Sequence, residues 1–156
     1  MRVGLAVVFL SSALAGPGAA QEPATKETKE TKETLQSLPP QVREAVLAQS
    51  RGATLRGVAK ETQNGVTLYE VETIAHGRTR DIMLDAQGKV VSVEEQTTLG
   101  EIPDKARAAI LKAVGTRKLV LLEKVTKGEI TFYEGHIHNG RSLSEVKVDA
   151  GGKPVE

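Results

Sequence analysis

Two stretches of the chain carry the same helical spacing of apolar positions. The first places Val42, Ala45 and Val46, followed by the polar Gln49, at i, i+3, i+4 and i+7. The second repeats this spacing with Ala106, Ala109, Ile110 and Ala113. This spacing predicts one helix in each stretch with a single packed face. Prolines at the start, Pro39–Pro40 and Pro103, and glycines at the end, Gly52 and Gly115, fit the helix boundaries.

After each predicted helix, the pattern changes to short alternating runs separated by turn residues. Asn64–Gly65 is a two-residue hairpin signal, because both central residues of that turn need a positive φ. Further turns are expected at His76–Gly77, Asp85–Gly88, Lys127–Gly128, Asn139–Gly140 and Asp149–Gly152. The predicted fold is therefore α+β, with two tandem repeats, each one helix followed by a roughly four-stranded antiparallel meander sheet. Pro154 replaces Val90, so the last strand of the second copy should be short and lie at an edge.

Aligning the chain with itself at an offset of 64 residues shows the repeat directly. Tyr69–Glu70 falls on Tyr133–Glu134, and Asp85–Lys89 falls on Asp149–Lys153. Roughly a quarter of the aligned positions are identical and no gap is required. The alignment predicts a tandem duplication, with one copy over 38–99 and the other over 100–156.

Side chains on a strand point alternately to the two faces of the sheet, which separates the residues of each central strand. One face holds Tyr69, Val71 and Thr73 in the first copy, and Tyr133, Gly135 and Ile137 in the second. The other face holds Glu70, Glu72, Ile74 and His76, matched by Glu134, His136 and His138. We expect the tyrosine face to pack on the helix and the Glu/His face to contact water or a partner.

The N-terminus carries an export signal followed by a polar segment. One positive charge at Arg2, a short apolar run and the small residues Gly18-Ala19-Ala20 are typical of a secretory signal peptide over 1–20. Residues 21–37 contain a threefold Lys-Glu-Thr repeat without apolar positions. Such a segment cannot bury enough surface to offset its ordering entropy, so it predicts a disordered linker. The mature protein should be periplasmic or secreted, with no stable membrane anchor.

Composition excludes several classes of protein. The chain has 39% hydrophobic and 26% charged residues, a formal net charge of +1 and no cysteine. A nearly neutral chain lacks the positive charge expected of a nucleic-acid binder. Without cysteine, disulfides, thiolate metal sites and cysteine nucleophiles are excluded.

The helix-then-meander order, the Tyr-Glu pair on the central strand and the Asp-Ala-x-Gly-Lys turn resemble the PepSY-like family. That family includes beta-lactamase-inhibitor-like domains of exported bacterial proteins, and the similarity covers Leu38 to Glu156. The resemblance implies a non-catalytic module that binds, and restrains or inhibits, an exported enzyme such as a peptidase. In the tandem inhibitor-like arrangement, paired sheets form a concave binding surface. This chain lacks the disulfides of the inhibitor and has few aromatic residues.

With few aromatic side chains, an interface with a protein partner would depend on arginine, which is enriched at binding hot spots. Arg78, Arg80 and Arg141 follow the predicted strand turns and are the first candidates. Glu70 and Glu72, on the polar face, complete the set of candidate partner-binding residues.

The alternative prediction is a metal- or small-ligand-binding periplasmic protein. His136 and His138 share one strand face with Glu134, and zinc and copper accept such nitrogen and oxygen ligands. No serine-nucleophile motif, zinc-protease helix or phosphate-binding glycine loop occurs in the sequence. We therefore expect neither catalysis nor an organic cofactor.

Overall fold

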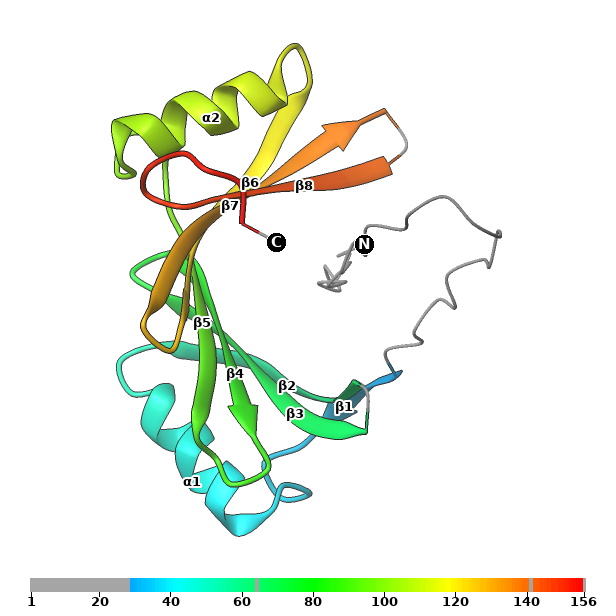
Figure 1. Ribbon diagram of the computed structural model, residues 1–156. Helices are drawn as coiled ribbons and strands as arrows, with labels where there is room; N and C mark the ends of the chain where they lie inside the picture. The colour runs from blue at the N-terminus through cyan, green and yellow to red at the C-terminus, as the bar shows by residue number, and fades with distance from the viewer. Residues whose placement is uncertain (1–28, 64, 141, 156) are drawn as a thin grey trace.

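The structure is a computed structural model that describes residues 29–155, apart from Asn64 and Arg141. The predicted signal peptide, the start of the predicted linker and Arg141 lie outside the described residues. Eight strands form one antiparallel sheet in the order β1-β2-β3-β4-β5-β6-β7-β8, so every strand pairs with its neighbours in sequence (Figure 1). Within the described residues, no helix combines the length and the apolar character needed to cross a membrane.

The elements follow the predicted order. The first half of the described chain contains β1 (Lys29–Glu33), α1 (Pro40–Gln49), β2 (Thr54–Gln63), β3 (Val66–Ala75), β4 (Arg78–Asp85) and β5 (Val90–Gln96). The second half contains α2 (Asp104–Val114), β6 (Lys118–Lys127), β7 (Ile130–Asn139) and β8 (Ser142–Val148). Pro154 forms only an isolated bridge to Val148, which confirms that the second meander ends in a short edge contact.

The two halves are joined in a single sheet. Strand β5 pairs with β6 from Ser92 opposite Lys127 to Gln96 opposite Glu123. The α+β fold with two tandem helix-plus-meander units is confirmed, and their sheets are continuous across this pairing.

The offset of 64 residues recurs in the backbone. A register shift lies between Leu55 and Gly57 of β2, and an equivalent shift lies between Leu119 and Leu121 of β6. Gly88 and Gly152 both have φ of 78°. In each turn the glycine passes so close to a helix that a Cβ would lie 2.6 Å or 2.5 Å from a helix carbonyl oxygen.

Each half has its own hydrophobic core between its helix and one face of the sheet. In the first half, Val42 and Val46 of α1 pack with the buried residues Val58, Tyr69, Val71, Ile82 and Leu84. In the second half, Ala106, Ile110 and Val114 of α2 pack with Leu122, Tyr133, Ile137 and Val148. The prediction that the tyrosine face packs on the helix is confirmed in both halves.

Strand β1 corrects the prediction of a disordered linker over residues 21–37. Lys29–Glu33 pairs antiparallel with β2, from Lys29 opposite Thr62 to Glu33 opposite Val58. The edge of β2 offers backbone donors and acceptors to a segment that has no apolar side chains of its own. The linker prediction is therefore wrong for these five residues.

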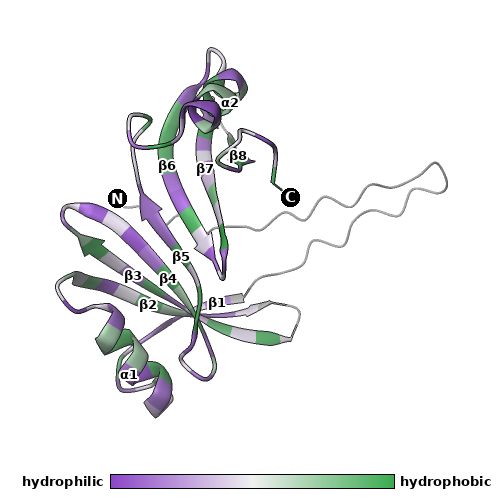
Figure 2. Cartoon of the chain, turned by 60° about the vertical axis from the view of Figure 1, so that its left-hand side comes forward, coloured by the Kyte–Doolittle hydropathy of each residue, from purple (hydrophilic) through white to green (hydrophobic). Residues whose placement is uncertain are grey.

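The sheet is strongly curved, and the two helices lie on its convex side (Figure 1). The opposite, concave face spans both halves. Hydrophilic and hydrophobic residues follow one another along the strands (Figure 2), as expected when one side of a sheet packs on a helix and the other side carries polar residues.

Candidate functional site: the concave acidic face

The strand positions that alternate with the core residues form a surface rich in carboxylates, which we call the concave acidic face. Its acidic members are Glu61, Glu70, Glu72, Asp81, Glu94, Glu123, Glu134 and Glu145. Asp81 lies between two other carboxylates in the register, opposite Glu72 on one side and Glu94 on the other. Glu123 lies opposite Glu134. Like charges directly opposite each other destabilise a sheet, so this pattern opposes folding.

Several of these polar residues are buried, which corrects the expectation that the Glu/His face is open to water. Glu134 and His136 are each 2% exposed, and Glu123 is 3% exposed. The alternation of residues correctly placed Glu134 and His136 on the same face. It did not reveal the curvature of the sheet, which turns neighbouring side chains of this face toward one another.

Burial and the repulsion between neighbouring carboxylates raise the pKa values of acidic residues in the first half, including β5, the strand that pairs with the second half. Burial, followed by the charges of Glu61, Asp81, Glu72 and Glu30, raises the pKa of Glu70 to about 8. Burial, followed by the negative charges of Glu123 and Glu72, raises the pKa of Asp81 to about 7.

Glu94 on β5 behaves in the same way. Burial and then the charges of Glu123, Glu134 and Asp81 raise its pKa to about 7, although Lys147 opposes the shift. A substantial fraction of these carboxyl groups therefore holds a proton near neutral pH.

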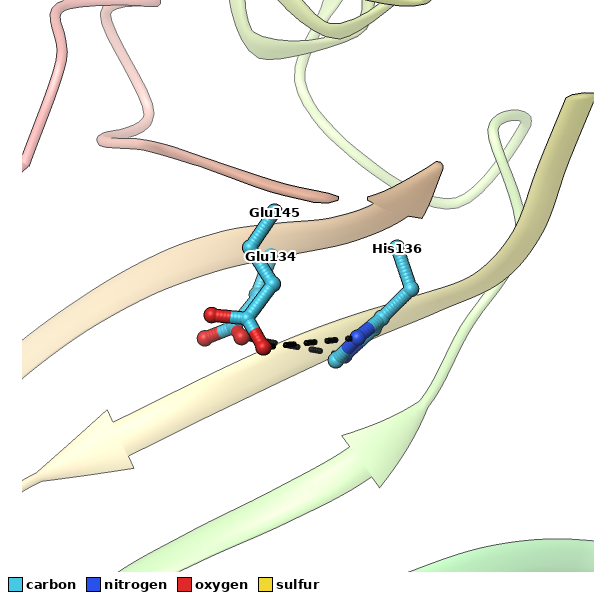
Figure 3. Close-up of side chains that lie close together, drawn as sticks. All are labelled: Glu134, His136 and Glu145. Atoms are coloured by element: carbon cyan, nitrogen blue, oxygen red, sulfur yellow. Dashed lines mark ion pairs between the residues drawn. The ribbon is translucent and has the colours of Figure 1, made fainter. Parts of the chain in front are cut away.

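In the second half, the face carries a compact cluster of charged groups around His136. The Nε2–H of His136 donates a hydrogen bond to Glu123 Oε2 over 2.9 Å. Nε2 also lies 3.7 Å from Glu134 Oε1, and Nδ1 lies 3.8 Å from Glu145 Oε1 (Figure 3). Lys147 Nζ lies 3.3 Å from Glu134 Oε2 and 3.6 Å from Glu145 Oε2.

These neighbours also determine the acidity of the cluster. Burial alone lowers the pKa of His136, but the hydrogen bond to Glu123 and the charges of Glu123, Glu134 and Glu145 outweigh it, so the pKa is raised. Burial raises the pKa of Glu134, against the opposing effects of Lys147 and His136.

The ligand atoms that the structure brings together are those of Glu134, His136 and Glu145, which lie within 4.8 Å of one another. The sequence prediction contained Glu134 and His136, whereas His138 is exposed and lies outside this cluster. The sequence analysis missed Glu145 and Glu123. The register supplies them, since Glu145 lies opposite His136 and Glu123 lies opposite Glu134.

Arg78 and Arg80, the candidate arginines that the structure describes, lie elsewhere and have partners within the chain. Arg78 forms two hydrogen bonds to the Glu101 carboxylate, of 2.7 Å and 3.0 Å. Arg80 donates to the Gln49 carbonyl oxygen at the end of α1 and lies 3.4 Å from Glu95. Both line an open cleft of about 550 Å³. Of the predicted partner-binding residues that the structure describes, only Glu70 and Glu72 lie on the concave acidic face.

No family model matches this sequence, and no curated protein matches it. Solved structures do match. A BLIP-like protein from Bacteroides fragilis has 15% sequence identity and a TM-score of 0.56, with 76% of this chain and 84% of that chain covered. A DUF2874 family protein from Bacteroides ovatus has 13% identity and a TM-score of 0.60, over 77% and 86% of the two chains.

A third match is one of the "putative periplasmic proteins" of Bacteroides eggerthii. It has 14% identity and a TM-score of 0.63, over 76% of this chain and 86% of that chain. At these identities the matches establish the architecture. The chain therefore has the BLIP-like fold of these Bacteroides proteins, as the PepSY-like resemblance predicted.

Proposed function

We propose that this chain is an exported, non-catalytic binding protein whose concave acidic face receives a basic surface of another exported protein. The expected consequence is restraint or inhibition of a periplasmic or secreted enzyme, such as a peptidase. The BLIP-like fold supports a binding role, and the signal-peptide pattern supports export.

The observation that carries the proposal is the excess of partly buried carboxylates on this face. Among the described residues, Glu70, Glu72 and Asp81 form no ion pair, and the pKa values of Glu70 and Asp81 are raised. Desolvated like charges cost free energy in the unbound protein. A basic partner would recover part of that free energy when it binds, because its cations would stabilise the charged carboxylates.

The preferred partner group is arginine. Its planar guanidinium binds a carboxylate through two parallel hydrogen bonds and is more weakly hydrated than an ammonium group. Since Asp81 lies between Glu72 and Glu94 in the register, one protruding basic loop could contact carboxylates of three adjacent strands. Charge complementarity of this kind accelerates association and makes it sensitive to salt.

The test is capture of partners from an envelope extract with the mature protein as bait. The wild type is compared with a Glu70→Gln/Asp81→Asn variant, which keeps the side-chain shapes and removes two carboxyl groups that a basic partner would ionise. The control is Glu44→Gln/Glu129→Gln, which removes two carboxyl groups from exposed positions on α1 and the β6–β7 turn.

We expect the wild type and the control to retain the same specific basic protein, and the Glu70→Gln/Asp81→Asn variant to lose it. Retention should also weaken as salt is added. Recovery of no specific protein, or equal recovery by both charge variants, would contradict the proposed function.

Export is tested separately by fractionation of the producing cells. We expect the protein in the envelope or the medium, with Gln21 as its first residue because the signal peptide is cleaved after Ala20. An uncleaved chain that starts at Met1 in the cytoplasm would refute export.

A further inference from the structure

Glu134 and Glu145 each present one oxygen to His136 and the other to Lys147. Glu134 Oε1 lies 3.7 Å from Nε2 of His136, and Glu145 Oε1 lies 3.8 Å from Nδ1. Their Oε2 atoms lie 3.3 Å and 3.6 Å from Lys147 Nζ. Lys147 thus holds the two carboxylates side by side and partly neutralises them. The Oε1 atoms of the two carboxylates remain next to the imidazole ring of His136 (Figure 3).

One of these oxygens is buried and has no hydrogen-bond donor. Glu134 Oε1 accepts no hydrogen bond, and the residue is only 2% exposed. A buried carboxylate oxygen normally accepts hydrogen bonds, because its desolvation is otherwise uncompensated. A cation placed among Glu134, His136 and Glu145 would supply the missing partner.

The hydrogen bond between His136 and Glu123 prepares the imidazole ring to bind such a cation. A metal ion that binds His136 would displace the proton on Nδ1. Because Nε2–H donates to Glu123, the ring then carries its lone pair on Nδ1, the nitrogen that faces Glu145. A carboxylate that accepts the second ring N–H fixes the tautomer and orientation of metal-binding histidines.

We propose that Glu134, His136 and Glu145 bind a divalent transition-metal ion of the zinc type, through Nδ1 of His136 and one oxygen of each carboxylate. The ligand atoms of these residues lie within 4.8 Å of one another. Zinc bonds of about 2.0–2.2 Å require donor atoms roughly 3.4 Å apart in a tetrahedral site. Glu145 lies at the surface and can move closer. Three protein ligands leave the fourth position open to water or to a ligand group from a partner.

The proposal goes beyond protein binding and does not depend on it. Zinc binding is tested by calorimetric titration of the mature protein near neutral pH, with Ca²⁺ titrated in parallel. We expect one Zn²⁺ per chain and much weaker binding of Ca²⁺, which prefers a larger set of oxygen ligands. Absorption of bound Co²⁺ then reports the coordination geometry, and we expect the spectrum of a four-coordinate site.

The decisive variant is Glu145→Gln, which alters a ligand at the surface and leaves the buried His136–Glu123 hydrogen bond in place. We expect it to weaken Zn²⁺ binding at least about tenfold and to abolish the Co²⁺ spectrum of the site. The matched controls are His76→Ala and His138→Ala, which remove the two exposed histidines of the chain. Both controls should bind Zn²⁺ as the wild type does.

Three results would overturn the proposal. They are the absence of stoichiometric Zn²⁺ binding by the wild type, full affinity in Glu145→Gln, and loss of binding in His138→Ala. None of these results depends on partner capture, so failure of the metal site can be distinguished from failure of the proposed function.

Glu123 acts as a positioning residue, and a pair of variants tests this role. Glu123→Gln keeps an oxygen that accepts the Nε2–H bond, and Glu123→Ala removes it. We expect Glu123→Ala to weaken Zn²⁺ binding about tenfold or more, and Glu123→Gln to restore most of the affinity. Equal affinities in the two folded variants would exclude the positioning role.

Discussion

Glu70, Glu72 and Asp81 of the first half occupy the positions that Glu134, His136 and Glu145 occupy in the second half. Each pair is 64 residues apart, and the strand neighbours agree. Glu72 lies opposite Asp81, as His136 lies opposite Glu145. A fourth position differs as well, since Met83 lies opposite Glu70 whereas Lys147 lies opposite Glu134.

The comparison shows that the negative charge of the concave acidic face is compensated differently in the two halves. In the first half, protons compensate the charge, because the pKa values of Glu70 and Asp81 lie at about 8 and about 7. In the second half, His136 and Lys147 lie among the carboxylates as cationic partners.

On the helix-facing side, the two halves share the buried tyrosine, the register shift in the strand after the helix, and the turn glycine. Tyr69 and Tyr133 both lie in the cores, and Gly88 and Gly152 have the same φ. The replacement of Glu72 and Met83 by His136 and Lys147 changes the charge of the concave acidic face between the two halves. We infer that the first half is suited to a basic partner and the second to a bound metal ion.

The largest effect is expected when His136 is replaced so that the second half copies the first. His136→Glu adds a fourth carboxylate beside Glu123, Glu134 and Glu145 and leaves Lys147 as the remaining cation of this cluster in the part of the chain that the structure describes. Leaving buried charges uncompensated is strongly destabilising, so we expect a loss of about 3 kcal/mol in the free energy of unfolding. Urea denaturation at mildly alkaline pH measures it.

The control for this substitution is His138→Glu, which adds the same charge at an exposed position of the same strand. We expect it to change stability by less than about 0.5 kcal/mol. If the two variants were equally stable, the compensating role of His136 would be wrong.

Gly88→Ala and Gly152→Ala test the side of the molecule that the halves share. Each new Cβ would lie within 2.6 Å of the carbonyl oxygen of Gln41 or Lys105, at a positive φ. Overlap with backbone cannot be relieved by a side-chain rotation, so we expect each variant to lose about 2 kcal/mol. Gly140→Ala, where φ is also positive but no atom lies within 4 Å, serves as the control.

We expect Gly140→Ala to lose only about 1 kcal/mol, the cost of the backbone conformation alone. Urea denaturation of all three variants makes the comparison. A large difference between Gly88→Ala and Gly152→Ala would show that the two helix–turn contacts are not equivalent.

The sequence was sufficient to predict the helices, the turns and the packed face, because these depend on local periodicity. The residues Val42, Val46, Ala106 and Ile110 are all buried, as their helical spacing required. Strand β1 was not predictable in this way. Its Lys-Glu-Thr residues have no apolar pattern, and the strand forms through backbone pairing with β2.

The candidate site was only partly predictable, because it depends on neighbours across strands. Alternation along β7 places Glu134 and His136 on one face, but only the register brings Glu123 and Glu145 beside them. The 64-residue alignment contained a usable signal, since Asp81 and Glu145 are both acidic at equivalent positions. The burial of these groups requires the curvature of the sheet, which no local pattern specifies.

The raised pKa values predict that stability falls as the pH rises from about 5 to about 8. Glu70, Asp81 and Glu94 bind protons more tightly in the folded state than in the unfolded state, where their pKa values are ordinary. The folded state therefore holds more protons across this window, and deprotonation weakens it. His136 acts in the same direction, since its raised pKa contributes stability that is lost as the pH rises through that value.

A pH series of urea denaturation curves measures this slope. Glu70→Gln should reduce the slope and stabilise the protein by about 1 kcal/mol near pH 8, where it removes a charge that opposes Asp81 and Glu61. Near pH 5 it should have little effect, because Glu70 is already protonated there. Stability that increases from pH 5 to pH 8 would refute the assignment of these pKa shifts.

The smallest effect is expected when the first half is made to copy the second with Glu72→His/Met83→Lys. The two substitutions place an imidazole opposite Asp81 and an ammonium group opposite Glu70. Because Glu72 is exposed, solvent screens the new ion pairs, and we expect a gain of only about 0.5 kcal/mol near neutral pH. The more informative readout is the pKa of Glu70, followed by NMR titration of its side-chain carboxyl carbon. The new cations should lower that pKa from about 8 toward the ordinary range. An unchanged pKa would show that cations at these positions do not offset burial and the neighbouring carboxylates, and that His136 and Lys147 are not what distinguishes the second half.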